Sequence, residues 1–238
     1  MTNSTFDEPY RQILVHSPGR VGSTTIISAL SRARVGPCDL LHTHILNEET
    51  LIWGFENRPK EFLARRDVGY ALVARATPTD SLERSIIVPI RSRLLRNASD
   101  FFWSRATSDM SVDLLLDDFL KNYPHEYVDT WLEQELTVPV GVKWRTLVPN
   151  SSGLWTCSSD WGQIAFVGVP NGLESLSGWL PTGWFREDLE YGTHLATVDE
   201  RYRQFVLGLV ELGYAVRQRD EGRRPYTWEW LVERVSAS

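Results

Sequence analysis

The stretch ILVHSPGRVGSTTIISALSRA, residues 13 to 33, decides the fold of this chain. It begins with the apolar run Ile13 to Val15, which is typical of a buried strand, and ends in a helix-compatible stretch from Thr24 to Ala33. Between them lies a turn in which Gly19 and Gly22 let the backbone approach a ligand closely. This order predicts that main-chain N–H groups at a helix N-terminus bind a phosphate.

A second anion-binding pattern is IIVPIRSRLLRNAS, residues 86 to 99. The apolar run Ile86 to Ile90 predicts another strand, and Arg91, Arg96 and Ser99 follow it. Arginine forks and a hydroxyl on the first turns of a helix can surround a dianionic phosphate, and the positive end of the helix dipole adds to the attraction. Two such patterns on one chain indicate a nucleotide that carries phosphate at two ends.

Short strand-like runs that alternate with helix-like stretches predict an α/β fold. We expect a P-loop-like, three-layer fold with a central parallel sheet flanked by helices, formed by residues 1 to 238 as a single domain. Ligands of such sheets bind beyond the carboxyl ends of the strands, where both patterns lie. The strands are expected at Ile13 to Val15, Asp39 to Leu41, Tyr70 to Ala74, Ile86 to Ile90, Val138 to Val142 and Gln163 to Val169. The loop Pro149 to Gly153 separates the last two, and further helices are expected in residues 111 to 135, broken near Asn122 to Pro124, and from Arg201 to Leu212.

Composition excludes several classes of protein. The 238 residues carry a net charge of -6, so most of the surface would repel a nucleic acid. No apolar run approaches the roughly 20 residues that span a bilayer, and the polar N-terminus has no secretory signal, so a cytoplasmic location is expected. Cys38 and Cys157 are too few for a disulfide framework or a metal cluster, and no metal is expected.

The first turn is not a typical nucleotide triphosphate loop. That motif requires glycine, four residues, and then Gly-Lys-Ser/Thr, whereas here Gly22 is followed by Ser23 with no lysine. A site for ATP or GTP is therefore disfavoured. A P-loop kinase or other phosphotransferase stays open as an alternative.

The turn instead resembles the 5′-phosphosulfate loop of sulfotransferases that use 3′-phosphoadenosine 5′-phosphosulfate (PAPS). The matching residues are Arg20, Val21, Gly22, Ser23, Thr24 and Thr25. These enzymes also place an arginine at the end of a strand, often another five residues later, and a serine eight residues after the first. Arg91, Arg96 and Ser99 reproduce this spacing, which implies binding of the 3′-phosphate. The usual Asp-Pro after the first arginine is absent, and Ser92 and Arg93 stand in its place.

A pair of histidines lies between these patterns, in LLHTHIL at residues 40 to 46. Its Thr-His-Ile step resembles the Thr-His-Leu segment of small-molecule sulfotransferases, which makes His44 the candidate general base and implies a catalytic role. An imidazole with an ordinary pKa near ~6.5 suits proton removal near neutral pH. His42 stands where that family often has lysine, and either assists or only forms hydrogen bonds. Glu48 and Glu49 are alternative bases.

A closer resemblance is to bacterial sulfotransferase-like proteins associated with capsular polysaccharide synthesis. It covers residues 12 to 142 and rests on Gly-Ser-Thr-Thr, His-x-His-x-Leu, Arg-Asn-x-Ser-x-Phe-Phe and Trp-x-x-x-Glu-Leu, which here are residues 22–25, 42–46, 96–102 and 131–136. The resemblance implies an enzyme that transfers a sulfuryl group from PAPS to a hydroxyl or amine of a glycan or small metabolite. Arg20 would stabilise the departing oxygen, and 3′,5′-bisphosphoadenosine (PAP) would be the nucleotide product.

Two aromatic regions add further hypotheses. Four tryptophans either stack on the ring of an acceptor or pack against the protein: Trp155, Trp161, Trp179 and Trp184. Arg223 or Arg224, in GRRPYTWEW at residues 222 to 230, could contact the nucleotide, and a tryptophan there could stack on adenine. A non-catalytic protein that binds a nucleotide or carbohydrate is the other alternative. Such a protein would bind its ligand, and His44→Ala would have no measurable effect on turnover.

Overall fold

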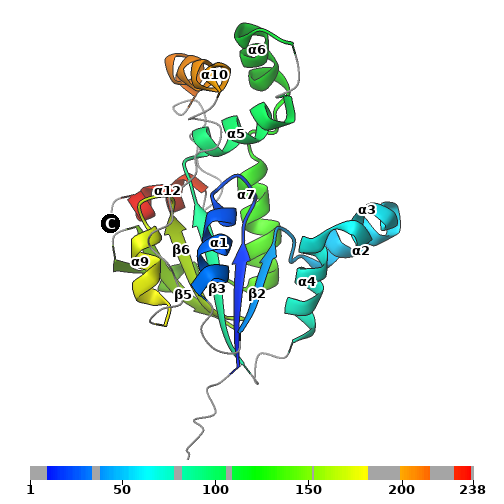
Figure 1. Cartoon of the computed structure of the whole chain (residues 1–238), viewed down its shortest axis with the longest axis vertical. Helices are drawn as coiled ribbons and strands as arrows, with labels where there is room; N and C mark the ends of the chain where they lie inside the picture. The colour runs from blue at the N-terminus through cyan, green and yellow to red at the C-terminus, as the bar shows by residue number, and fades with distance from the viewer. Residues whose placement is uncertain are drawn as a thin grey trace, which may run out of the picture.

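The computed structural model describes residues 10–33, 38–77, 82–105, 109–151, 153–181, 199–214 and 228–236. Trp184, Arg223 and Arg224, which the sequence raised as ligand contacts, lie outside these residues. The described residues form an α/β fold in which helices surround a six-strand sheet (Figure 1). Within this part of the chain no helix is both long and apolar enough to span a membrane.

The sheet has the strand order β2-β1-β3-β6-β5-β4 and is mixed. The first four strands in this order pair in parallel, whereas β5 pairs antiparallel with both β6 and β4. The expectation of a wholly parallel sheet is therefore wrong at one edge. The reason is the short turn at Asp160 and Trp161, because a two-residue connection can join only antiparallel strands. The strands are β1 (Arg11–His16), β2 (Cys38–Thr43), β3 (Glu83–Ile90), β4 (Val148–Ser151), β5 (Leu154–Ser159) and β6 (Gly162–Gly168).

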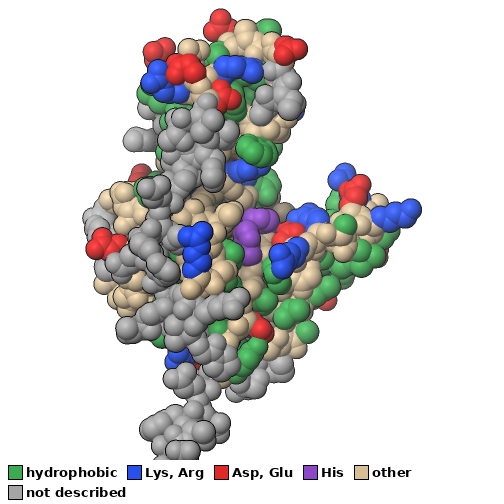
Figure 2. All heavy atoms as spheres, viewed as in Figure 1, with side chains coloured by type: hydrophobic (Ala, Val, Ile, Leu, Met, Phe, Trp, Pro, Cys, Tyr) green, Lys and Arg blue, Asp and Glu red, His purple; other side chains and the backbone are tan. Residues whose placement is uncertain are grey.

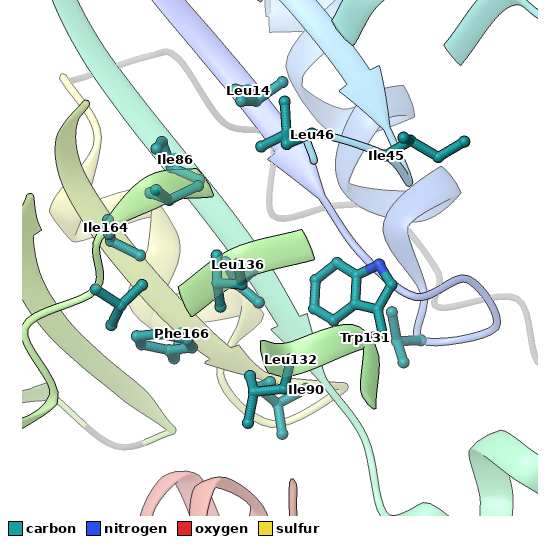
Figure 3. Packing of buried hydrophobic residues seen from close by; sticks show 14 of the residues in the cluster. Leu14, Ile45, Leu46, Ile86, Ile90, Trp131, Leu132, Leu136, Ile164 and Phe166 are labelled. Carbon is teal, nitrogen blue, oxygen red and sulfur yellow. The ribbon is translucent and has the colours of Figure 1, made fainter. Parts of the chain in front are cut away.

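Each face of the sheet has its own hydrophobic core, because successive side chains of a strand point to opposite faces. Ile13 and Val15 pack against α1 (Ser23–Ala33), on the face that α9 (Leu173–Trp179) also covers. Leu14 lies in the core of the other face (Figure 3). The helices packed there are α4 (Arg66–Ala76), α7 (Tyr127–Trp131), the π-helical turn η2 (Leu132–Thr137), α8 (Val138–Val140) and α12 (Trp228–Ser236).

A third hydrophobic cluster forms a lobe beyond the carboxyl end of β3 (Figure 1). The lobe consists of α5 (Arg93–Arg105), α6 (Val112–Asn122) and α10 (Glu200–Glu211), whose aromatic side chains pack together around Phe119 and Phe205. A second projection, the arm, consists of α2 (Glu48–Asn57) and α3 (Pro59–Ala64), which lead into α4. The lobe and the arm stand on either side of the ends of β1 and β2 (Figure 1).

Two predicted strands are helices instead. Tyr70 to Ala74 lies inside α4, which buries Val68, Ala71 and Ala74, a spacing of three that belongs to a helix. Val138 to Val142 contains α8, which continues from η2 and ends at Gly141 with a φ of 66°. Short apolar runs do not distinguish a strand from a buried helical segment, which is why both expectations failed.

The other predicted elements are confirmed within a few residues. They are the strands around Ile13, Leu40, Ile86 and Gln163, the helix after Gly22, the pair of helices broken near Asn122, and the helix from Arg201. The loop expected at Pro149 to Gly153 is partly the edge strand β4, which is too short to show a period of two.

Candidate functional site

The loop between β1 and α1, residues 17 to 22, has an unusual backbone. Gly19, Arg20 and Gly22 all have positive φ values, of 78°, 58° and 86°. Arg20 is the residue for which this left-handed conformation is costly, because it has a Cβ atom. Strain of this kind, at the end of a strand and before a helix N-terminus, is typical of a ligand-binding turn.

The carbonyl groups of this loop accept hydrogen bonds from two arginine side chains. Arg96 donates to Pro18 O (3.0 Å) and Gly19 O (3.4 Å), and Arg91 donates to Arg20 O (3.4 Å). Within the described chain, the main-chain N–H groups of residues 20 to 24 donate to no protein acceptor. A run of N–H groups at the start of a helix attracts anions, so the loop has the chemistry of a phosphate site.

Not every loop residue offers its side chain. Val21 is fully buried in the core, so only its N–H is available. Ser23 is 5% exposed, Thr24 is exposed on the first turn of α1, and the Thr25 N–H donates to Gly22 O. The predicted loop therefore presents one exposed hydroxyl, that of Thr24, together with its N–H groups.

The Arg20 side chain lies against α5. Its guanidinium is 4.8 Å from the centre of the Trp103 ring and 3.9 Å from an oxygen of Asp100. Trp103 is 53% exposed, so this stacked pair faces solvent beside the loop. Sequence reasoning did not single out Trp103 or Asp100, because their spacing from the arginine motif carries no signal without the helix.

Arg91 and Arg96 have different environments. Arg91 is half-buried at the end of β3, and its carbonyl accepts a hydrogen bond from the indole of Trp228 (2.8 Å). Arg96 is 1% exposed, donates to Tyr123 Oη (2.6 Å), and lies over the ring of Tyr127. Arg91 thus retains N–H groups for a ligand, whereas Arg96 is largely committed to the protein.

Ser99 lies one helical turn beyond Arg96 on α5 and is 8% exposed. Arg93, the residue between the two predicted arginines, is buried and forms ion pairs with Asp129 and Glu229. Burial raises the pKa of Glu229, and the guanidinium opposes this shift. Arg93 therefore joins α5, α7 and α12, and does not face the loop.

His44 lies just beyond β2, next to the loop. Its Nδ1 is 2.6 Å from the carbonyl oxygen of Ser17 and 3.3 Å from the Ser17 hydroxyl. A carbonyl only accepts, so the proton is on Nδ1 and the lone pair is on Nε2. This is the tautomer that a general base needs.

His42 is packed edge-on against His44, with ring centres 4.8 Å apart. Burial, with a smaller contribution from His44, lowers the pKa of His42 to about 4. Its Nε2 is buried and has no hydrogen-bond partner among the described residues. His42 is therefore neutral near pH 7 and does not compete for the proton.

The alternative bases are less well placed. Glu48 forms an ion pair with Arg75 (2.6 Å) on the exposed side of α2, and Glu49 is exposed in the same turn. In the described residues no three His, Cys, Asp or Glu side chains are arranged to hold a metal ion.

The surface around these groups is concave. Figure 2 shows histidine and basic side chains in the depression between the lobe and the arm. A separate hollow of about 160 Å³ opens beside Arg91, lined also by Ser92, Asn171 and Ser236. Three of the four tryptophans make packing contacts with the protein: Trp155 donates to Arg234 O (2.7 Å), Trp161 lies against the Arg84 guanidinium, and Trp179, the last residue of α9, packs against the core on that face of the sheet.

No family model, curated protein or solved structure matches this chain. The class of protein is therefore described from the structure alone. It is an α/β protein in which a strand-loop-helix turn, an arginine and a histidine lie together at the carboxyl ends of β1, β2 and β3. The predicted residues Arg20, Arg91, Arg96 and His44 all contact this loop or belong to it.

Proposed function

We propose that this protein is a sulfotransferase that moves a sulfuryl group from PAPS to a hydroxyl or amine of a glycan or small metabolite. The observation that carries the proposal is the bond from His44 Nδ1 to the carbonyl of Ser17, because it sets the free nitrogen of a base beside an anion-binding loop. We further propose that the fold is P-loop-like and that the protein works in the cytoplasm.

Three sets of protein groups bind PAPS in this proposal. The N–H groups of residues 20 to 24, with Arg20 and the Thr24 hydroxyl, hold the 5′-phosphosulfate. Arg91 and Ser99 hold the 3′-phosphate. Arg96 has a supporting role, since its guanidinium already bonds to the carbonyls that shape the loop. Arg96 therefore supports the loop in this proposal, whereas the motif suggested that it contacts the phosphate directly.

The reaction is an in-line displacement at sulfur, helped mainly by positioning and charge neutralisation. The acceptor oxygen or nitrogen forms a bond to sulfur while the bond from sulfur to the bridging phosphate oxygen breaks. That oxygen leaves with the electron pair as part of PAP, stabilised by the loop N–H groups and Arg20. His44 Nε2 takes the proton of the acceptor, and Nδ1–H stays on the Ser17 carbonyl.

The test is calorimetric titration with PAP, AMP and magnesium ATP. We expect tight binding of PAP and weak binding of AMP, because Arg91 and Ser99 read the 3′-phosphate. A preference for magnesium ATP would support the phosphotransferase alternative. Absence of binding to all three would refute a nucleotide site.

The Arg91 assignment has a separate test. Arg91→Ala should weaken PAP binding by about 2 kcal/mol, roughly 30-fold, through loss of a charge-assisted hydrogen bond. AMP binding should hardly change. Arg105→Ala is the matched control, since Arg105 is an exposed arginine at the far end of α5 that pairs with Asp118. Equal PAP affinity in Arg91→Ala and the wild type would remove Arg91 from the site.

A further inference from the structure

We infer that Trp131, the last residue of α7, and Glu135, in the η2 turn that follows, are positioning residues for His44. This inference rests on the proposed function for the catalytic meaning of His44. The positioning itself does not depend on that function: Trp131 and η2 fix the main chain from His44 to Asn47, and this main chain fixes the His44 ring.

The first contact is from Trp131. Its indole Nε1–H donates to the carbonyl of His44 at 2.9 Å, and its side chain is 3% exposed. The same ring packs against His16, with centres 4.7 Å apart. Trp131 therefore fixes the peptide group of the proposed base and packs against the last residue of β1.

The second contact is from the Glu135 carboxylate, which is 6% exposed as a residue. One oxygen accepts from the main-chain N–H groups of Leu46 (2.6 Å) and Asn47 (2.8 Å), and the other accepts from the Thr50 hydroxyl (2.7 Å). Leu46 and Asn47 are buried, so their N–H groups would otherwise lack a partner. Bonds to an ionised carboxylate are the strong kind.

The backbone of η2 adds to these contacts. Glu135 O accepts from His16 Nε2 (2.7 Å), and Gln134 O accepts from the side-chain amide of Asn47 (2.8 Å). A π-helical turn shifts carbonyls out of the regular α-helical pattern and is frequent at functional sites. Here it lets one turn contact the ends of both β1 and β2. A helix that served only to pack the core would not need these polar contacts.

The experiment compares five variants by a signature of the His44 ring. Long-range ¹H–¹⁵N spectra of protein labelled with ¹⁵N-histidine, recorded at pH 8, report which ring nitrogen carries the proton, and His44→Gln identifies the signal. Glu135→Met removes the acceptor at similar length, Glu135→Gln retains one acceptor oxygen, and Trp131→Phe removes only the donor and part of the ring. Thr50→Val removes a single bond. Glu133→Gln makes the same charge change at an exposed side chain of the same turn.

We expect the wild type, Glu133→Gln and Glu135→Gln to hold the proton on Nδ1, and Glu135→Met and Trp131→Phe to show both tautomers. PAP affinity should stay within threefold in all variants, while transfer of the sulfuryl group from PAPS to water, measured as PAP release, should fall at least tenfold in kcat in Glu135→Met and Trp131→Phe. If Glu135→Met does not fold, Thr50→Val should show a smaller change in the same direction.

Two results separate the possible failures. A wild-type tautomer and wild-type PAP release in folded Glu135→Met and Trp131→Phe would overturn the positioning role and leave the sulfotransferase proposal intact. Failure of the wild type to bind PAP would refute the proposed function, whereas the tautomer change in the variants would still support the positioning of His44.

Discussion

Arg91 and Arg96 occupy equivalent positions in the sequence motif, yet their side chains are available to different degrees. The spacing of the motif predicts that both bind a phosphate, but only the packing of Tyr123 and Tyr127 against Arg96 shows that this guanidinium is enclosed. A residue type can therefore be predicted for a site while its role cannot, because the role depends on contacts from segments far along the chain.

This difference predicts losses of stability of different size for two substitutions. Arg96→Ala should lower the free energy of unfolding by roughly 3 kcal/mol, because it removes several buried bonds to a charged group. Arg91→Ala should lower it by less than about 1 kcal/mol, because Arg91 is half-buried and makes one long bond to the loop. Urea unfolding at pH 7.5 measures both. Similar losses of stability would mean that Arg91 also supports the loop.

His42 gives a pH-dependent prediction. Its pKa is about 4 in the folded protein against an ordinary value of 6.5, so the unfolded chain binds a proton first as the pH falls. The stability from neutral His42 is therefore complete above pH 6.5 and is lost as the pH falls toward 4. Between pH 8 and pH 5 the loss is roughly 2 kcal/mol.

His42→Gln should remove that part of the acid sensitivity, because glutamine does not titrate. Urea unfolding of both proteins at pH 8 and pH 5 gives the comparison. His16 is buried and has a pKa lowered to about 3 by desolvation, so it should leave a residual acid sensitivity in both proteins. An identical pH dependence in the two proteins would contradict the assignment to His42.

At the scale of elements, α12 is attached to the site by polar contacts of buried groups. Asp129 of α7 accepts from the Trp228 N–H (2.8 Å) and from Arg93, and the Trp228 indole donates to Arg91 O. The last helix thus holds the end of β3 in place. Nothing in the sequence spacing links residues so far apart, which is why this connection could not be predicted.

Asp129→Ala should lower the free energy of unfolding by about 3 kcal/mol, because it leaves Arg93 with one carboxylate and removes the acceptor of the first N–H group of α12. Arg93→Met together with Asp129→Ala should recover part of the loss, since the unsatisfied charge is then absent. Chemical denaturation of the single and double variants tests this. Additive losses would argue against a coupled ion pair.

The elements that the sequence predicted correctly share a physical property. Strands β1, β3 and β6 have long apolar runs, and α1, α6 and α10 have a clear helical period, so burial decides their state. The helices α4 and α8 were expected to be strands, because a short apolar run does not distinguish a strand from a buried helical segment. Their conformation is selected by packing against the sheet.

At the scale of the molecule, the site combines groups with a net charge of opposite sign to that of the protein. The chain carries -6 overall, whereas the loop, Arg20 and Arg91 form a positive region at one edge of the sheet. The sequence could predict that the candidate residues meet at this edge, because parallel strands bring their carboxyl ends together. The lobe and the arm beside it were not, since their packing depends on side chains distant in sequence.

This arrangement predicts a moderate dependence of PAP binding on ionic strength. Raising sodium chloride from 50 to 500 mM should weaken PAP binding roughly tenfold, because salt screens the attraction of partly exposed charges. Arg91→Ala should have a smaller dependence, since one of those charges is absent. Titration at three salt concentrations tests this, and a slope that is equal in both proteins would place the 3′-phosphate away from Arg91.

The pairing of β1 with β2 has a consequence for how this protein can change. The Ser17 N–H bonds to Thr43 O, and Ser17 O accepts from His44, so His44 and the loop after β1 are held in one strand register. The walls of the depression come from the arm and the lobe, which are separate units of the chain. Under the proposed function, substitutions in those walls would exchange one acceptor for another while the distance between His44 and the donor loop stays unchanged. Redesign of acceptor choice should therefore begin in the arm and the lobe.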